Sequence, residues 1–384
     1  MESMPVELLY LIASNLNSCD LGNVRCTCSK LAAAYAPLVA RNGISVLNTS
    51  DNLKEFNGFL ETEIAASTRV LTVYHGEWQV CKRKEWEIHP LLHGGNDRSN
   101  HAYVQDHYAL KANIAFLAYA RFIESEKNRR RGDDIETIHH ALNTLKNLHT
   151  INRSNFQTWQ PTHNSKYYRL LKKIWLLPHR QGPITRVVEA FLLGFGNGFQ
   201  NIKSLGIYGA FDAADVQIAP EKRFNSFERL YVSCFQVYDS QDNIHQFLEA
   251  FPNLLHLSIG FQGWGPSIPD VIGHLFWSRL KTLCLKEIWA SEKDLLTIFT
   301  RHRSTLEAFS LHHGALTQGS WRSLFTRIRS MNTGVEVTAK GELYGRSSKH
   351  TIILHAAAAS NLARFMKDEN TPWPFVASAS DTPS

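Results

Sequence analysis

Apolar residues recur at a near-constant interval in the second half of the chain. Pairs of apolar residues separated by one residue begin at positions 205, 230, 257, 283 and 309, in steps of 25, 27, 26 and 26 residues. A weaker pair, Val335 and Val337, adds a further step of 26. Successive side chains of a strand point to opposite faces, so both members of such a pair lie on one face. We therefore expect one strand in each interval, with these pairs facing inward: Leu205/Ile207, Leu230/Val232, Leu257/Ile259, Leu283/Leu285 and Phe309/Leu311.

Helical periodicity fills several of the gaps between these strands. Apolar residues at i, i+3, i+4 and i+7 predict amphipathic helices. A strand and a helix in 26 residues resemble a leucine-rich repeat, whose period is about 20–29 residues. A doubly wound sheet is the alternative, but its βαβ units need about 30 residues or more. The helical stripes are Ile244/Phe247/Leu248/Phe251, Leu295/Ile298/Phe299 and Trp321/Leu324/Phe325/Ile328.

The repeats are degenerate at one position. Three residues after each pair, leucine-rich repeats carry an Asn or Cys that satisfies backbone groups in the turn. This chain has other residues there, so a polar ladder along the turns is not expected. The residues are Ala210, Phe235, Gln262, Ile288 and Gly314.

The first 45 residues predict three short helices. Leu8, Leu9, Ile12 and Leu16 recur at helical spacing behind Pro5, which the first turn of a helix tolerates. Asp20 has a side chain suited to cap a second helix, and a third helix is expected to run until Pro37. Three short helices cannot bury this many apolar residues among themselves. An exposed apolar face of this kind usually meets a partner or the next domain.

These N-terminal residues resemble the F-box pattern of Leu-Pro-x-Glu-Leu, Ile, Leu, Asp-Leu and Arg-x-x-Cys-x-x-Leu, which covers about a tenth of the chain. Met4 stands in place of the usual leucine, and Tyr35 can take the place of the aromatic residue near the end of the motif. A generic three-helix cap would share the periodicity but not the motif. The matching residues are Pro5, Glu7, Leu8, Leu9, Ile12, Leu16, Asp20, Leu21, Arg25, Cys28 and Leu31.

The two resemblances together imply an α/β protein, in which a three-helix F-box precedes a leucine-rich-repeat-like solenoid of parallel strands. In that family the F-box docks on a Skp-type adaptor, and through it on a cullin, while the repeats hold the protein to be ubiquitinated. The target protein itself is unknown. The resemblance assigns adaptor binding and the packing behind it to Pro5, Leu8, Leu9, Ile12, Leu16, Leu21 and Val24.

Four segments are expected along the chain: the F-box-like unit at 1–45, a helix-rich connecting region at 46–200, the array at 201–345 and a terminal segment with a flexible tail at 346–384. The connecting region can hold irregular first repeats. It predicts a helical stripe at 53–64, a strand at 70–73, a loop at 89–107 and helices at 108–126 and 134–148. The first of these last two helices is apolar nearly all round and is expected to be buried.

The target-binding surface is expected on the strand face and on the loops that follow the strands. If the apolar pairs face inward, then Gly206, Tyr231, Ser258, Cys284 and Ser310 face outward as a flat strip. Aromatic residues in the following loops fit an interaction hot spot, although they can also cover the ends of the core. The candidates are Tyr208, Phe235, Phe261, Trp264, Trp289 and His312.

Charge and composition narrow the class of protein. The chain has a net charge of +6, but its densest basic run, 127–131, is followed at once by Asp133 and Asp134. This pattern favours a solvated loop, and nucleic-acid association is left as a remote alternative. Six cysteines without a CxxC pair indicate reduced thiols inside the cell. No apolar run approaches the roughly 20 residues that span a bilayer, so we expect a cytoplasmic or nuclear protein without a membrane partner.

No catalytic signature stands out. GxSxG, HExxH and phosphate-loop motifs are absent, and the histidines lack metal-chelating spacing. We therefore expect a chain that is not an enzyme and that needs no cofactor or metal. The alternative within the same class is a leucine-rich-repeat scaffold that does not belong to a ligase.

Overall fold

The computed structural model divides the chain into two compact units. Unit 1 comprises Met1–Leu148 and Arg153–Gly194, and unit 2 comprises His149–Asn152 and Phe195–Ser384. Each is a mixed α/β structure, and each is described here by itself. The structure describes residues 4–13, 15–16, 18–25, 27–76, 78, 80–87, 101–129, 132–155, 174, 185–194, 201–216, 218–219, 221–236, 241–261, 263, 267–331, 334–345 and 351–375.

Unit 1 begins with the three predicted helices, α1 (Val6–Ala13), α2 (Ser18–Arg25) and α3 (Ser29–Asn42). Two details differ from the prediction. Asp20 lies inside α2 rather than before it, and α3 continues through Pro37 to Asn42. A proline inside a helix removes one hydrogen bond. The helix continues because the last turns bury Ala36 and Ala40.

The rest of unit 1 alternates strands and helices. The parallel strands β1 (Ile44–Leu47) and β2 (Val70–His75) pair side by side, with Val46 opposite Val73. The predicted stripe at 53–64 is helical in α4 (Ser50–Leu60), which buries Leu53, Phe56 and Leu60; its last residue, Ile64, lies beyond α4 in a 3-10 helix. The other elements are the 3-10 helix η1 (Glu63–Ser67), α5 (Arg83–Glu87), α6 (His101–Lys127), α7 (Asp133–Thr144) and α9 (Thr185–Gly194).

Helix α6 corrects two expectations. It begins at His101, so the last part of the predicted loop at 89–107 is helical; residues 89–100 lie outside the described residues. Its side towards Trp86 buries Ala115 and Tyr119. Ile114 and Leu117 on another side are 57% and 58% exposed, so the helix is not buried all round.

The strands of unit 2 follow one another in chain order. Each strand from β4 to β9 pairs with the next in parallel, and the predicted pairs are in register: Leu205, Leu230, Leu257, Leu283 and Phe309 are direct neighbours. These five residues are at most 1% exposed, so the predicted register and inward orientation are confirmed. The strands are β4 (Ser204–Asp212), β5 (Arg229–Gln236), β6 (His256–Phe261), β7 (Thr282–Ala290), β8 (Ala308–Leu316) and β9 (Glu336–Tyr344); β3 (Thr150–Asn155) lies at the division between the units.

The sixth predicted pair is displaced by two residues. Phe309 lies opposite Val337 rather than Val335, which precedes β9. The inward pair is therefore Val337 and Ala339, which are 3% and 1% exposed. The pattern misled the prediction because Val335 stands at the regular interval, whereas the connection between β8 and α13 (317–320) is three residues longer than the one between β7 and α12, and α13 is one residue shorter than α12.

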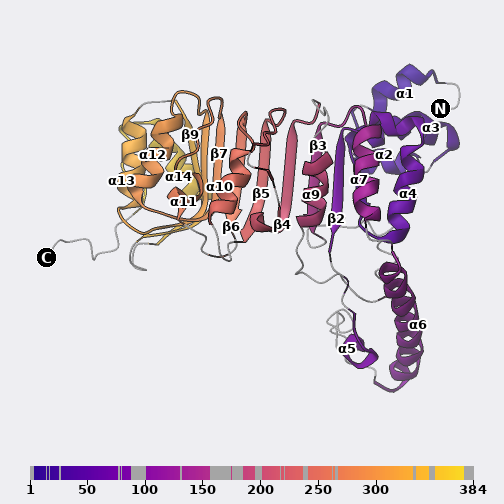
Figure 1. The fold of residues 1–384 in the computed structure, drawn as a ribbon. Coiled ribbons are helices and arrows are strands. Elements are labelled where there is room, and N and C mark those ends of the chain that lie inside the picture. Colours follow the sequence, from indigo (N-terminus) through magenta and orange to yellow (C-terminus); the bar gives the residue numbers. More distant parts are fainter. Residues whose placement is uncertain are drawn as a thin grey trace. The chain divides into compact units, whose positions relative to one another are not determined.

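Helices cover one face of this sheet (Figure 1). The ring centroids of Phe247 and Phe211 are 5.1 Å apart, and those of Phe299 and Phe309 are 5.8 Å apart, so α10 and α12 pack against the inward side of the strands. The three predicted helices are α10 (Gln241–Glu249), α12 (Glu292–His302) and α13 (Trp321–Ser330). The prediction missed α11 (Ile268–Ile272), which is too short to display a helical period.

The strands bend at one level of the sheet. Glu287 and His313 have φ values of 52° and 51°, and Gly341 has a φ of 76°. They follow Lys286, His312 and Lys340, which are paired with one another in register. After each of these kinks the strand returns to the core, at Ile288 in β7, Gly314 in β8 and Leu343 in β9. Ile288 and Gly314 are buried for this reason, where a leucine-rich repeat would carry a polar side chain.

A C-terminal segment packs against β9 and α13 of unit 2. Strand β10 (Ile352–Leu354) pairs antiparallel with β9, and helix α14 (Ala356–Lys367) follows it. Arg329 lies 3.9 Å from the ring centroid of Phe365 and donates to the carbonyl oxygen of Thr371 at 3.0 Å. Trp373 packs against Phe325 and Phe365. Residues 371–375 are thus packed rather than part of a flexible tail, and residues 376–384 lie outside the described residues.

Candidate docking surfaces

The three N-terminal helices enclose a small core. Its buried members are Leu9, Ala13, Leu21, Leu31 and Tyr35. The backbone N–H of Leu9 donates to the carbonyl oxygen of Pro5 at 3.2 Å, so Pro5 stands at the start of the first turn of α1. Because α1 has only eight residues, it cannot place all its apolar side chains in this core.

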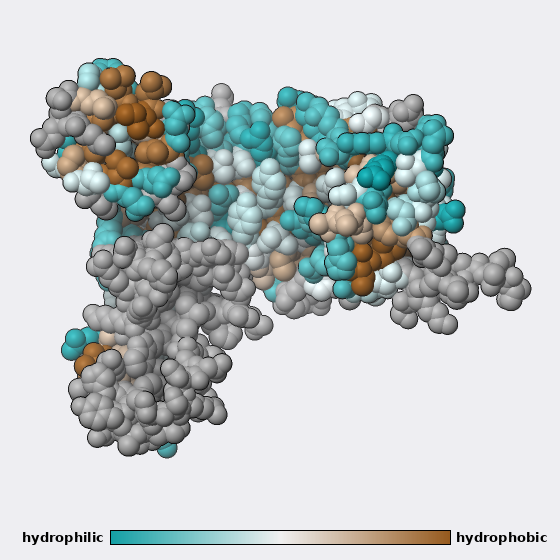
Figure 2. Space-filling view, turned by 180° about the vertical axis from the view of Figure 1, so that it is seen from behind, coloured by the Kyte–Doolittle hydropathy of each residue, from teal (hydrophilic) through white to brown (hydrophobic). Residues whose placement is uncertain are grey.

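Helix α1 is apolar on two sides. Leu9 and Ala13 are each 1% exposed and point inward, whereas Leu8, Leu11 and Ile12 are 50%, 63% and 47% exposed. Hydrophobic residues gather visibly over the N-terminal helices in the space-filling view (Figure 2). We call the exposed residues Pro5, Leu8, Leu11 and Ile12 the apolar face of α1. Leu11 was missed by the motif, although its place beside Leu8 and Ile12 on a helical wheel would have revealed it.

The seven residues assigned to adaptor binding fall into three groups. Pro5, Leu8 and Ile12 are exposed. Leu16 and Val24 are half-buried at the edge of the small core, and Leu9 and Leu21 are buried within it. The exposed group can contact a partner directly. The buried pair can affect such a contact only by holding α1 and α2 in place.

The aromatic candidates in unit 2 divide between surface and core. Tyr208 and Trp289 are 37% and 42% exposed, and His312 is half-buried. Phe235 and Phe261 are 0% and 1% exposed, which removes them from the predicted surface. Their rings lie 5.9 Å apart in the core, because the strand returns inward just after its outward-facing residue. Trp264 lies outside the described residues.

The predicted outward strip is present as a row across the sheet. Gly206, Tyr231, Ser258, Cys284 and Ser310 pair in register on adjacent strands. All are half-buried except Gly206, which is buried. The next row on the same side holds Gly260, Lys286, His312 and Lys340. Burial and the neighbouring Lys286, Lys340 and His313 lower the pKa of His312.

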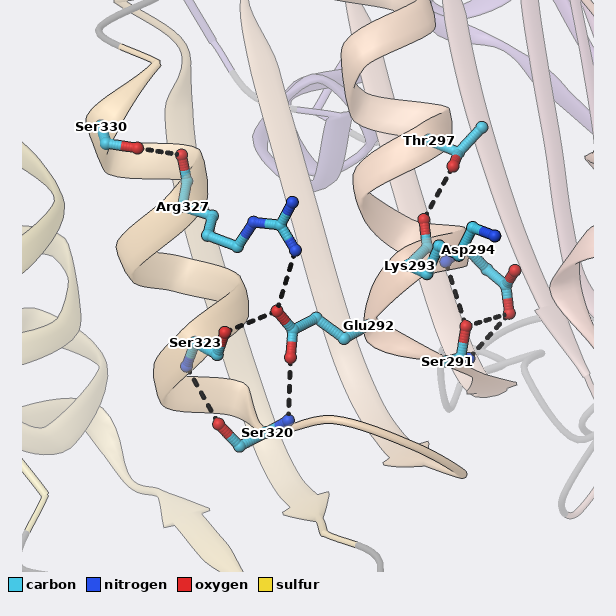
Figure 3. Close-up of polar contacts among 9 residues, drawn as sticks. All are labelled: Ser291, Glu292, Lys293, Asp294, Thr297, Ser320, Ser323, Arg327 and Ser330. Carbon is cyan, nitrogen blue, oxygen red and sulfur yellow. Dashed lines mark hydrogen bonds and ion pairs between the residues drawn. The ribbon is translucent and has the colours of Figure 1, made fainter.

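A polar cluster at the starts of α12 and α13 acts as helix caps. Ser291 Oγ accepts from the backbone N–H of Asp294 at 3.1 Å, and the Asp294 carboxylate accepts from the backbone N–H of Ser291 at 2.9 Å (Figure 3). Glu292 accepts from Ser320 and Ser323 on the next helix. The serines and carboxylates of this cluster are used to satisfy helix ends. Lys293 takes part in the drawn network through its backbone carbonyl oxygen, which accepts from Thr297 Oγ1 at 2.8 Å.

Among the described residues, no group of three or more His, Cys, Asp or Glu side chains could hold a metal ion. Within the same residues, no helix combines the length and apolar character needed to cross a membrane. In the basic run 127–131, Arg129 donates to the carbonyl oxygen of Asn48 and pairs with Glu126 at 3.4 Å; Arg130 and Arg131 lie outside the described residues.

Comparison with the models of known protein families finds no match, and comparison with curated proteins also finds none.

Proposed function

We propose that this chain is the non-catalytic substrate receptor of a Skp–cullin–F-box ubiquitin ligase. The N-terminal helices would dock on a Skp-type adaptor and through it on a cullin, and unit 2 would hold a protein target. The observation that carries the proposal is the apolar face of α1, where Leu8, Leu11 and Ile12 are about half exposed or more. These side chains lie on helices whose residues resemble the F-box pattern.

The energetics of the apolar face support docking. Moving an exposed leucine or isoleucine into an interface contributes roughly 1–2 kcal/mol, because about half of the side chain is already out of water. Leu8, Leu11 and Ile12 together would supply several kcal/mol. Leu9 and Leu21, buried behind them, would hold α1 in place for that contact.

We also infer that unit 2 is a leucine-rich-repeat-like solenoid. Supporting this are the parallel order of β4 to β9 and the shared register of their first inward residues. Helices α10, α11, α12 and α13 each follow a strand and bury apolar side chains. The departures are the left-handed kinks at Glu287 and His313 and the apolar turn positions.

The mechanism would be proximity. A receptor that holds adaptor and target at once raises the effective concentration of target lysines near the charged ubiquitin carrier. This chain would make and break no bonds and would use no cofactor. Its place of action would be the cytoplasm, the nucleus or both.

A double variant tests the docking proposal. Leu8→Ala with Ile12→Ala removes two exposed side chains without emptying the small core. We expect its affinity for a purified Skp-type adaptor to fall about 30-fold, which corresponds to about 2 kcal/mol. Affinity is measured by titration calorimetry, and circular dichroism checks that the fold persists.

The matched control is Ile114→Ala with Leu117→Ala, on α6. These side chains are exposed to a similar degree, at 57% and 58%. The control should bind the adaptor as the unmodified chain does. Equal affinity of the Leu8/Ile12 variant and the unmodified chain would contradict the docking site. Absence of adaptor binding by the unmodified chain would leave the scaffold alternative.

A further inference from the structure

Unit 2 presents one sheet face without a described helix on it. We call this the open face; it is formed by the outward-facing residues of β5 to β9. Helices α10 and α12 pack on the opposite side, through Phe247 against Phe211 and Phe299 against Phe309. In the view from behind, the middle of the molecule is mostly pale to teal, which marks residues of intermediate to hydrophilic character (Figure 2).

Three cationic or potentially cationic side chains lie side by side on this face. Lys286, His312 and Lys340 pair in register on β7, β8 and β9. Lys286 and His312 are half-buried, and Lys340 is exposed. Beneath them, in the neighbouring row, Ser310 and Thr338 share a hydrogen bond of 2.8 Å between their hydroxyl groups.

The two lysines of this row differ from other lysines of unit 2. Lys203 pairs with Glu228 at 3.4 Å, and Lys281 pairs with Glu307 at 2.6 Å. Among the described residues, no ion pair joins Lys286 or Lys340 to a carboxylate. Their charge is therefore available to a ligand instead of being neutralised within the chain.

His312 reports the local electrostatic potential. After burial, the groups that lower its pKa are Lys286, Lys340 and His313, and none of the charged groups that act on it raises it. Acidic residues do occur in these strands, at Glu287, Glu336 and Glu342. The Glu287 carboxylate acts on Cys234 of β5, where it raises the thiol pKa. The potential around His312 is thus positive.

We propose that Lys286, His312 and Lys340 form a docking site for an acidic, extended segment of a protein partner. If the proposed function holds, this partner is the target, and the inference rests on that function for its role. Carboxylates at i and i+2 of an extended peptide lie on one side of it, about 7 Å apart. The flexible stems of two lysines can reach both. The hydroxyl groups of Ser310 and Thr338 can form hydrogen bonds with the peptide backbone between its two carboxylates.

The test uses the full chain and a fluorescein-labelled peptide of alternating Glu and Ala, with a Gln-for-Glu peptide as reference. Fluorescence anisotropy should give at least tenfold tighter binding of the Glu peptide at low salt, and added salt should reduce the difference. The double variant Lys286→Gln with Lys340→Gln should lose the preference for the Glu peptide. The control variant Lys203→Gln with Lys281→Gln removes the same charge elsewhere and should keep this preference.

Two results would contradict the proposed docking site. One is equal binding of the Glu and Gln peptides by the unmodified chain, and the other is an unchanged preference for the Glu peptide in the Lys286/Lys340 variant. Tighter binding of a labelled single-stranded oligonucleotide, lost in the same variant, would reassign the row to nucleic acid. Melting temperatures confirm that each variant is folded. The Leu8/Ile12 variant should bind the Glu peptide normally, and the Lys286/Lys340 variant should bind the adaptor normally, so failure of either proposal is distinguishable.

Discussion

The carboxylate of Glu292, in the first turn of α12, accepts a hydrogen bond from the backbone N–H of Ser320 at 3.0 Å. Ser320 is the N-cap of α13, so one helix satisfies a donor at the start of the next. Ser323 Oγ donates to the other carboxylate oxygen at 2.6 Å, and Arg327 lies 3.5 Å from it. Glu292 thereby joins two successive strand-and-helix segments, in addition to the contacts of their cores (Figure 3).

We predict that Glu292→Ala lowers the stability of unit 2 by about 1–3 kcal/mol, because the backbone N–H of Ser320 and the half-buried hydroxyl of Ser323 lose a charged acceptor. For a unit of this size the melting temperature should fall by about 2–4 °C for each kcal/mol. Glu307→Ala is the matched control, since the Glu307 side chain is 66% exposed in its pair with Lys281. Exposed pairs contribute little. Equal effects of the two changes would contradict the capping role of Glu292.

Replacement by alanine should have opposite effects on the free energy of unfolding at Gly341 and at Gly58. Gly341 has a φ of 76°, and a Cβ there would overlap the ring of His313. Gly341→Ala should therefore cost at least 1–2 kcal/mol of unfolding free energy. Gly58 lies within α4 with nothing within 4 Å of an added Cβ, so Gly58→Ala should stabilise by about 0.5–1 kcal/mol. Chemical denaturation measures both, and stabilisation by Gly341→Ala would refute the conformational argument.

His302 should make unit 2 less stable in mild acid. Its side chain is 2% exposed between the rings of Phe276 and Trp277. Burial, with a smaller contribution from Arg301, lowers its pKa to about 4. The unfolded chain takes up this proton near pH 6.5, so unfolding becomes easier as pH falls from about 6.5 to 4. The loss attributable to this group is up to about 3 kcal/mol.

The measurement for His302 is denaturant unfolding at a series of pH values. His302→Phe preserves an aromatic ring for stacking and removes the titrating nitrogen, so its stability should depend less on pH in this range. His256 and His312 also have lowered pKa values and supply a background of the same sign in both proteins. Identical pH dependence of the variant and the unmodified chain would argue against a role for His302.

The sequence did not predict which individual residues are buried and which are exposed. The helical period placed Leu8 and Leu9 on one helix, but only the packing of α1 against its neighbours put Leu9 inside and left Leu8 half exposed. Likewise, the position of Phe235 after the pair Leu230/Val232 suggests a loop residue, whereas Phe235 lies inside β5. The kink between Val232 and Phe235 returns it to the core, and such a kink has no clear signature in the residues.

Local periodicity predicted strands β4 to β8 and helices α10, α12 and α13 of unit 2. Alternation placed Leu257 and Ile259 on one face of a strand, and the helical spacing located Phe247 and Phe325, because both patterns are set by backbone geometry within a few residues. The tertiary structure decided what depends on distant neighbours. It set Val337 rather than Val335 opposite Phe309, brought Glu292 to Ser320, and aligned Lys286, His312 and Lys340 into one row. Strand pairing and burial are contacts between residues far apart in the chain, so no local pattern specifies them.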